Sequence, residues 1–289
     1  MIFHYTNKYG DVGVELEKSM TIKQNNDTTI FRDPAAYLCF SFHVQEKNRY
    51  IHNQDTVRFL NAVRETIKNR EKYFPKDTKF WRARLGSAKS EGVKFHDKAY
   101  AQKDVPYPPK EMKPVAGKAI EGRVNPKGIP CLYLATNIQT AIQEVRPWLN
   151  AKITVAKFQT VKNLRLVDCS RNIKIDGIGN DNPGSSSKKE ETLIECEERT
   201  WSWIARSFSI PVNPSDDEAD YVPTQILAEL FRAEGYDGVV YNSQFVEGQN
   251  VALFDSSLAE PVDIKLYNIT KIPPFKFEEV HCQFARSKT

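Results

Sequence analysis

The segment from Cys131 to Pro147 constrains the fold more than any other part of the sequence. It opens with CLYLAT, a short apolar run of the kind that becomes a buried strand. Apolar residues then recur at helical spacing from Ile138 to Val145, with Asn137 in the position of an N-cap. Because the residue before a proline is pushed out of the α region, the helix must stop near Pro147. A strand followed at once by a short helix is therefore expected.

Strand-like and helical runs alternate irregularly through the rest of the carboxyl-terminal half. ITVAKF at 153–158 and LRLVDC at 164–169 are separated by a short charged turn, which predicts an antiparallel hairpin. Antiparallel strands combined with separate helices are typical of the α+β class. The further elements expected are a polar loop over 170–190, helices over 193–208 and 223–235, strands over 239–241 and 251–255, and a β-rich end.

The chain is expected to divide into a small, mostly helical region, residues 1–75, and a larger domain, residues 76–289. In the first region, apolar residues at spacings of three and four predict a helix over 53–70, which Asn53 would cap. A strand around 37–44 is an alternative for the part before it. No motif in this region selects a function.

The run FWRARL at 80–85 alternates large and charged residues as a half-buried strand does. Either Arg82 or Arg84 would therefore point inward, where it needs an anionic partner from the protein or from a ligand phosphate. The stretch 86–128 that follows is rich in Lys, Pro and Gly and is expected to be a long loop. Such a loop either shapes a binding site or acts as a flexible linker.

Composition excludes several classes of protein. Lys and Arg total 41 against 37 Asp and Glu, and this net charge of +4 includes no dense basic run, which does not favour nucleic acid as a partner. The five cysteines form no CxxC pair, as expected in a reducing cytosol. No stretch approaches the ~20 apolar residues of a membrane span, and no P-loop motif or zinc-binding spacing occurs. We therefore expect a cytoplasmic protein without membrane contact.

Three polar segments are candidates for a functional site. The turn GRVNPKG at 122–128 presents Arg123 and Asn125, either to solvent or to an anion. Glu144 lies beside the apolar stripe of its helix and would face the rim of whatever the helix packs on, as a surface charge or as a functional carboxylate. Ser243 follows a predicted strand directly, where a polar group meets a ligand or simply forms a turn.

Taken in chain order, these segments resemble the RES domain family, which is named for Arg, Glu and Ser. The resemblance covers roughly residues 80–255. It departs from the family pattern at Val124, where a large aromatic residue is common, and in a longer loop after Arg82. The segments that carry it are the strand with Trp81 and Arg82, GRVNPKG, LYLATNIQTAIQEVR, GYDGVVYNS and GQNVALFD.

The resemblance implies a fold similar to that of ADP-ribosyltransferases, with a split β-core and flanking helices. It also implies the removal of nicotinamide from NAD⁺ by phosphate or by water. It assigns catalytic roles to Glu144, Arg82 and Ser243. It places the family's turn arginine on Arg123 and its tyrosine on Tyr133, as contacts of the substrate. Further candidate substrate contacts in these segments are Arg84, Asn125, Tyr241 and Asn250.

The chemistry of NAD⁺ suits such a set of residues. Nicotinamide in NAD⁺ is already cationic and leaves neutral, so one carboxylate suffices where a glycosidase needs two. No cofactor or metal is expected, because NAD⁺ is the substrate, and inorganic phosphate is a co-substrate only if it takes the place of water as the acceptor. The family also implies an antitoxin partner, and self-association is a further expectation. Two other functions stay open: ADP-ribosyl transfer to a macromolecule, and a non-catalytic module whose amino-terminal helices bind a partner.

Overall fold

The structure is a computed structural model of the whole chain. Expectations for the first 30 residues, and for most of the loop at 170–190, lie outside the described residues. No helix in the described part is long and apolar enough to cross a membrane. The residues described are 31, 33, 35–90, 94–95, 98–99, 102–171, 192–210 and 218–271.

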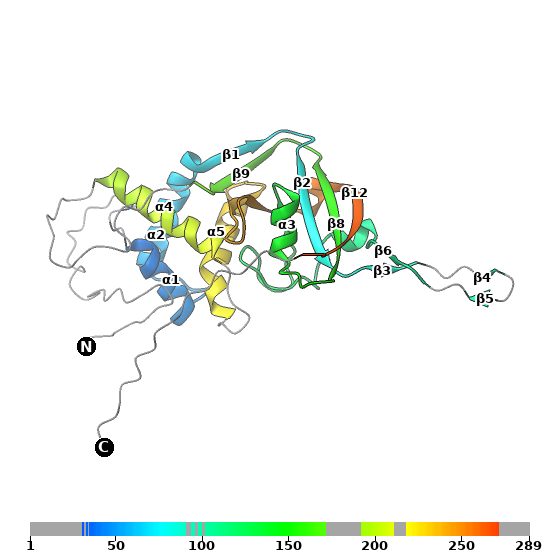
Figure 1. Cartoon of the computed structure of the whole chain (residues 1–289). Helices are drawn as coiled ribbons and strands as arrows, with labels where there is room; N and C mark the ends of the chain where they lie inside the picture. The colour runs from blue at the N-terminus through cyan, green and yellow to red at the C-terminus, as the bar shows by residue number, and fades with distance from the viewer. Residues whose placement is uncertain are drawn as a thin grey trace, which may run out of the picture.

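An eight-stranded mixed sheet forms the centre of the molecule (Figure 1). Its strands differ in order from the sequence, because the chain crosses between the two ends of the sheet. In spatial order they are β1 (Glu71–Phe74), β9 (Leu164–Cys169), β10 (Gly238–Asn242), β11 (Gln249–Leu253), β7 (Leu132–Ala135), β2 (Lys79–Leu85), β8 (Lys152–Thr160) and β12 (Ala259–Asn268).

The sheet is split between β7 and β2. These two strands pair through a single residue pair, Trp81 with Ala135, and then diverge. On one side of the split, β9 and β10 run parallel while the other neighbours are antiparallel. The expected α+β class and its split β-core are thus confirmed.

The expected hairpin of strands 153–158 and 164–169 is wrong. Both edges of β8 are occupied, by β2 and β12, and β9 pairs instead with β1 and β10. The residues between β8 and β9 carry the chain across the split, from the side of β2 and β12 to the side of β1 and β10. A short charged turn is compatible with such a crossing as well as with a hairpin, so the turn alone could not identify the partners.

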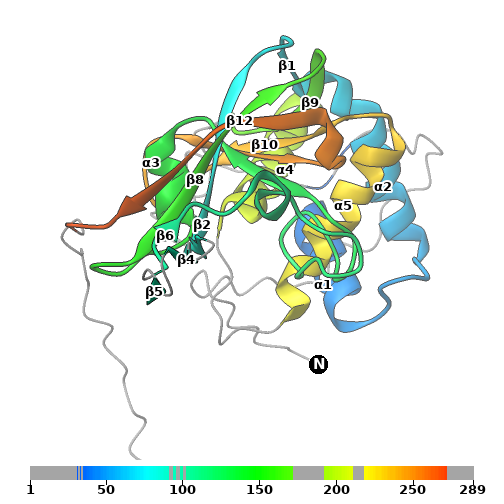
Figure 2. The same cartoon turned by 90° about the vertical axis from the view of Figure 1, so that its right-hand side faces the viewer.

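Four helices gather at one end of the molecule, and α3 (Ile138–Glu144) lies apart from them, against β2, β7 and β8 (Figures 1 and 2). The described residues also form short 3-10 helices of three or four residues. These are η1 (Ile67–Arg70), η2 (Pro109–Met112), η3 (Glu218–Tyr221) and η4 (Ser256–Leu258). The four gathered helices are α1 (Ala36–Glu46), α2 (Gln54–Thr66), α4 (Leu193–Ser209) and α5 (Val222–Ala233).

The alternative of a strand around 37–44 is wrong, because α1 covers these residues. Its buried residues Tyr37, Phe40 and Val44 follow helical spacing and pack into one cluster with α2, α4 and α5. The caps expected from the sequence are present: Asn53 Oδ1 accepts from Thr56 N at 2.8 Å. Since the amino-terminal helices share this cluster, a domain boundary near residue 75 stays a prediction.

The segment expected as a long loop, 86–128, is mostly irregular. Its four two-residue strands form two small ladders, and the β4–β5 ladder lies away from the body of the molecule (Figure 1). The same segment also supplies Met112, which is fully buried against the sheet. The short strands are β3 (Ala88–Lys89), β4 (Lys94–Phe95), β5 (Lys98–Ala99) and β6 (Asp104–Val105).

Successive side chains of β7 point to opposite faces of the sheet, and their contacts show which face carries the helices. Leu132 and Leu134 belong to the cluster on one face, which the 86–128 segment covers. Tyr133 packs against the α4–α5 cluster and Ala135 against α3, so all three helices lie on the opposite face. The candidate site lies on this helical face, between α3 and the end that bears α4 and α5.

Candidate active site

Glu144, Ser243 and Asn250 converge through direct hydrogen bonds. Ser243 Oγ donates to Glu144 Oε1 at 2.8 Å, and Asn250 Nδ2 donates to the same oxygen at 2.6 Å. Glu144 and Ser243 are half-buried, and Asn250 is buried. Within the described part of the chain, no donor reaches the second oxygen, Oε2. The carboxylate is therefore held in one orientation. One of its oxygens is engaged, and the other is available to a ligand.

The fold brings Glu144 to Ser243 and Asn250, which lie 99 and 106 positions further along the chain. Asn137 caps α3 by accepting from Thr140 N at 2.8 Å, and α3 ends at Glu144. Asn250 lies on β11 opposite Tyr241 of β10, on the helical face. Ser243 follows β10 directly. Pro147 limits the length of α3, and this length sets the position of Glu144 over the ends of the strands.

Arg123 and Tyr241 lie beside this group. The Arg123 guanidinium carbon is 5.7 Å from the centre of the Tyr241 ring. Burial raises the pKa of the Tyr241 hydroxyl to about 12, the positive charge of Arg123 opposes that rise, and the negative charge of Glu144 adds to it. Tyr241 thus lies within reach of both charges, and Arg123 has no carboxylate partner in the described part of the chain.

Tyr133 and Asn125 brace the turn that carries Arg123. The Tyr133 hydroxyl donates to Asn125 Oδ1 at 2.6 Å and accepts from Val124 N at 3.1 Å. Asn125 Nδ2 donates to three backbone carbonyl oxygens of the same loop, and Asn125 is only 1% exposed. A Cβ at Gly122 would lie 2.6 Å from the Tyr133 hydroxyl oxygen, so the turn requires glycine there. Both side chains have a structural role, and their contact with a substrate stays a prediction.

Arg82 and Arg84 project from the face of β2 opposite α3, and they differ in surroundings. Arg84 is exposed, bonds Glu111 Oε2 at 3.2 Å and packs over the Tyr107 ring. Arg82 is the inward residue: it donates to Tyr133 O at 2.9 Å, across the split. Its Nε is buried without a partner among the described residues, and burial, with the charge of Arg84, lowers its pKa to about 10. No contact joins it to Glu144 within the described part.

One residue of this region gave no functional signal in the sequence. Gly248 has a φ of +149°, and a Cβ there would lie 2.1 Å from Thr140 Oγ1 and 2.6 Å from Asn137 Nδ2. The loop after Ser243 therefore rests directly on the first turn of α3. Gly248 was detectable in principle as an isolated glycine beside a strand, which often marks close backbone approach.

The described residues hold no cluster of three or more His, Cys, Asp or Glu side chains able to bind a metal ion.

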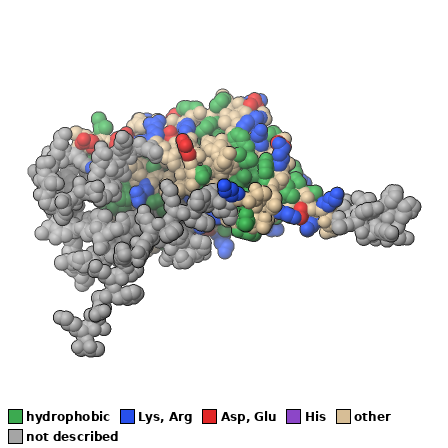
Figure 3. Space-filling view, in the orientation of Figure 1, with side chains coloured by type: hydrophobic (Ala, Val, Ile, Leu, Met, Phe, Trp, Pro, Cys, Tyr) green, Lys and Arg blue, Asp and Glu red, His purple; other side chains and the backbone are tan. Residues whose placement is uncertain are grey.

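On the face seen in Figure 3, lysine and arginine side chains are spread over the right-hand part, where acidic side chains are fewer. A surface of this kind attracts anionic ligands.

Comparison with known protein families matches residues 93–277, more than half of the chain, to the family described as RES domain. Arg123, Glu144 and Ser243 lie inside the match, whereas β2 with Arg82 lies before it. Among solved structures, the chain is similar to the M. tuberculosis MbcT–MbcA toxin–antitoxin complex, at 13% identity and a TM-score of 0.36, over 72% of this chain and 92% of that one. Comparison with curated proteins finds no match.

Proposed function

The chain belongs to the RES domain family, and on that premise we propose that it cleaves NAD⁺ between nicotinamide and ribose at Glu144. The convergence of Ser243 and Asn250 on one oxygen of this carboxylate carries the proposal. Two donors hold the carboxylate in one orientation, which is the preorganisation that electrostatic catalysis requires. The second oxygen is then available to a ribose hydroxyl.

The reaction needs little proton transfer. The bond between ribose C1 and the nicotinamide nitrogen breaks, and its electron pair neutralises the pyridinium ring as nicotinamide leaves. Positive charge develops on the ribose and is stabilised by Glu144. A new bond then forms from C1 to an oxygen of water, which releases one proton to solvent, or to an oxygen of inorganic phosphate.

We assign the pyrophosphate of NAD⁺ to Arg123 rather than to Arg84. Arg123 is half-buried and has no carboxylate partner among the described residues, whereas Arg84 is neutralised by Glu111. The forked donors of arginine match phosphate oxygens. Arg82 lies on the face of β2 opposite α3 and donates to Tyr133 O at 2.9 Å, so a direct contact with the substrate is not proposed for it.

A biological role follows from the chemistry. An enzyme that consumes NAD⁺ harms the cell that makes it, so we propose a toxin or defence effector restrained by an antitoxin protein that covers the site. Self-association is a further proposal, since residues 1–75 have no catalytic part in this scheme.

Incubation of the purified chain with NAD⁺, with and without inorganic phosphate, tests the proposed reaction. Release of nicotinamide is expected, together with ADP-ribose if water is the acceptor or ADP-ribose 1-phosphate if phosphate is. ADP-ribose attached to protein or nucleic acid would identify a transferase instead. NAD⁺ unchanged under both conditions would remove the proposal.

A further inference from the structure

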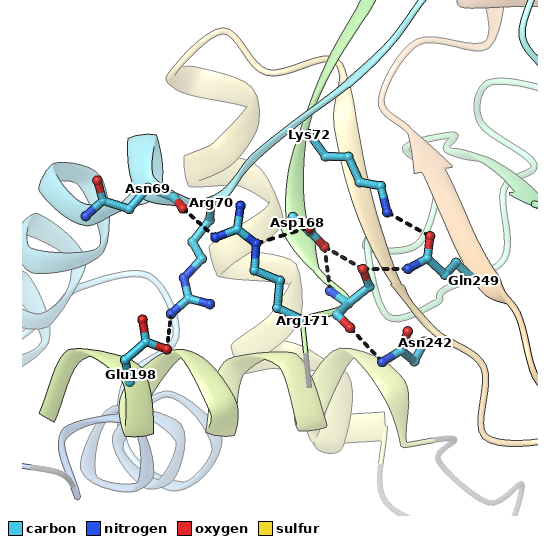
Figure 4. Close-up of polar contacts among 9 residues, drawn as sticks. Asn69, Arg70, Lys72, Asp168, Arg171, Glu198, Asn242 and Gln249 are labelled. Carbon is cyan, nitrogen blue, oxygen red and sulfur yellow. Dashed lines mark hydrogen bonds and ion pairs between the residues drawn. The ribbon is translucent and has the colours of Figure 1, made fainter. Parts of the chain in front are cut away.

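Two edge strands, β1 and β12, bound the eight-stranded sheet, and they differ in length and in surroundings. β1 has four residues, and its charged side chains are engaged within the molecule. Lys72 Nζ donates to Gln249 Oε1 at 2.8 Å, as Figure 4 shows, and Glu71 forms an ion pair with Arg165. β12 has ten residues, and in the described part of the chain the one strand that pairs with it is β8. A long edge of this kind is able to pair with a strand of another chain.

Hydrogen bonds at the end of β12 show which backbone groups face the open edge. Ile269 N donates to Ala151 O at 3.0 Å and Ile269 O accepts from Asn150 N at 2.8 Å, so both groups face the side of β8. Successive residues of an antiparallel strand direct their N–H and C=O groups alternately to the two neighbouring strands. The residues whose backbone groups therefore face away from β8 are Ile264, Leu266 and Asn268.

The first part of β12 is closed to a further strand. Pro261 has no backbone N–H to donate, and the register with β8 shifts between Pro261 and Asp263, which marks a β-bulge. Prolines and bulges on an edge strand limit the length over which another chain can pair with it. The part of the edge that is available to a further strand therefore begins after Pro261.

The side chains along this part of the edge are self-complementary. Asp263 and Lys265 lie on one face of the strand, with Oδ2 and Nζ 3.0 Å apart. In an antiparallel pair of two β12 strands centred on Ile264, Asp263 faces the partner's Lys265, and Lys265 faces the partner's Asp263. Opposite charges directly across a ladder stabilise the pairing. On the other face of the strand, the exposed Val262 approaches the partner's Leu266, so apolar groups also meet.

Neighbouring registers do not share this complementarity. A two-fold axis at Lys265 would place this residue opposite its own copy, and like charges across a ladder destabilise the pairing. An axis at Leu266 would leave both Asp263 and Lys265 without a charged residue across the ladder. The charges of the strand therefore select a second copy of the same strand, in one register.

We infer that β12 pairs with β12 of a second copy of this chain, antiparallel and centred on Ile264, so that two sheets join into one (Figure 2 shows β12 at the margin of the sheet). The inference gives the proposed self-association a defined surface. It is independent of NAD⁺ cleavage, because Glu144 lies at the end of α3 and takes no part in this ladder.

Sedimentation equilibrium of the full chain over a range of concentrations tests the inference, and the wild type is expected to dimerise reversibly. Asp263→Lys and Lys265→Asp each place like charges across the ladder twice in one dimer. We therefore expect the Kd of the dimer to rise at least about tenfold in each variant. An equimolar mixture of the two variants restores opposite charges, and it should form a heterodimer with about the wild-type Kd. A local effect of either substitution on its own chain would not be reversed by mixing.

The matched controls are Asp55→Lys and Arg58→Asp, at an exposed ion pair on α2. Both should dimerise as the wild type does, alone and in mixture. A wild type that stays monomeric, a Kd that is equal in all variants, or a mixture that forms no heterodimer would overturn the inference.

Thermal melts of the variants check the fold, because Asp263 also lies opposite Lys157 of β8. Lys265 lies opposite the uncharged Val155, so Lys265→Asp decides the outcome alone if Asp263→Lys unfolds early. Nicotinamide release is measured on the same samples, and the two proposals fail separately. Cleavage of NAD⁺ by a monomeric wild type would leave only the proposed function, and dimerisation without cleavage would leave only the β12 interface.

Discussion

Glu144 depends on two neighbours for its orientation, and each makes a separable contribution. Ser243 Oγ and Asn250 Nδ2 both donate to Oε1. Loss of one preorganised donor at a charge-stabilising site reduces rates by ~10²–10³-fold. The donors therefore matter through the carboxylate as well as through any contact with the ribose.

We predict that Ser243→Ala lowers kcat/KM for NAD⁺ by about 10²-fold with little change in thermal stability. The change removes one of the two donors that orient Glu144, and it opens no core cavity because Ser243 is half-buried. Steady-state kinetics and a thermal melt measure the two effects. Ser257→Ala, at an exposed serine, is the control, and equal rates in both variants would contradict the assigned role.

We predict that Asn125 contributes mainly to the stability of the fold. Its amide donates to three backbone carbonyl oxygens and its carbonyl accepts from Tyr133. At about 1 kcal/mol for each such bond, Asn125→Ala should lower the free energy of unfolding by about 2 kcal/mol or more. Denaturant titration measures this. A variant of unchanged stability with a raised KM for NAD⁺ would instead support direct substrate contact.

At the scale of single residues, the sequence predicted which side chains matter better than what each one does. Ordered motifs singled out Glu144 and Ser243, which the structure joins by a hydrogen bond. They could not separate Arg82 from Arg84, because alternation along a strand puts both on one face. Only the position of Glu111, from a distant segment, shows that Arg84 already has a counter-ion.

At the scale of elements, an ion pair ties the edge strand β1 to β9. Glu71 Oε1 accepts from Arg165 Nη2 at 2.6 Å and from the Tyr236 hydroxyl at 3.0 Å. The hydrogen bond from Arg165, followed by those from Tyr73 and Tyr236, lowers the pKa of Glu71 from 4.5 to about 2, although burial opposes this. The edge strand is thus held partly by a charge that acid removes.

The consequence for acid stability has a definite sign. Since the pKa of Glu71 is lower in the folded chain, its contribution is present above about pH 4.5 and is lost as the pH falls toward about 2. Glu71→Gln should therefore reduce stability at pH 6 and flatten the loss of stability between those pH values. Denaturant midpoints measured across this range test it, and parallel curves for both proteins would contradict it.

Local patterns predicted most elements and failed on strand partners. The helices over 53–70, 193–208 and 223–235 follow from apolar spacing, and the structure places helices there. The hairpin of β8 and β9 failed because strand pairing is decided by distant segments, here β12 and β1. The split between β7 and β2 likewise has no local signal.

At the scale of the whole molecule, the amino-terminal helices and the carboxyl-terminal half share one core. Phe59 of α2 stacks on Phe40 of α1 with ring centres 4.5 Å apart, and both lie in the cluster that contains Trp201 and Phe231. The predicted boundary near residue 75 came from a helical pattern that closes at Pro75, and such a local pattern does not show shared burial.

Phe59→Ala should destabilise the entire chain in one transition. Truncation of a buried Phe costs about 3–5 kcal/mol, and a shared core transmits that loss to the sheet. Far-ultraviolet circular dichroism and tryptophan fluorescence, followed together during unfolding, should shift by the same amount. Two separate transitions, with only one displaced, would show an independent amino-terminal domain.

The most direct test of the central claim is the rate of nicotinamide release from NAD⁺ by the wild type and by Glu144→Gln. The substitution keeps the shape of the side chain and removes its charge. With equal folding of the two proteins, we predict a rate at least about 10³-fold lower in the variant, because the charge that stabilises the developing cation is lost. Equal rates of release would contradict the account.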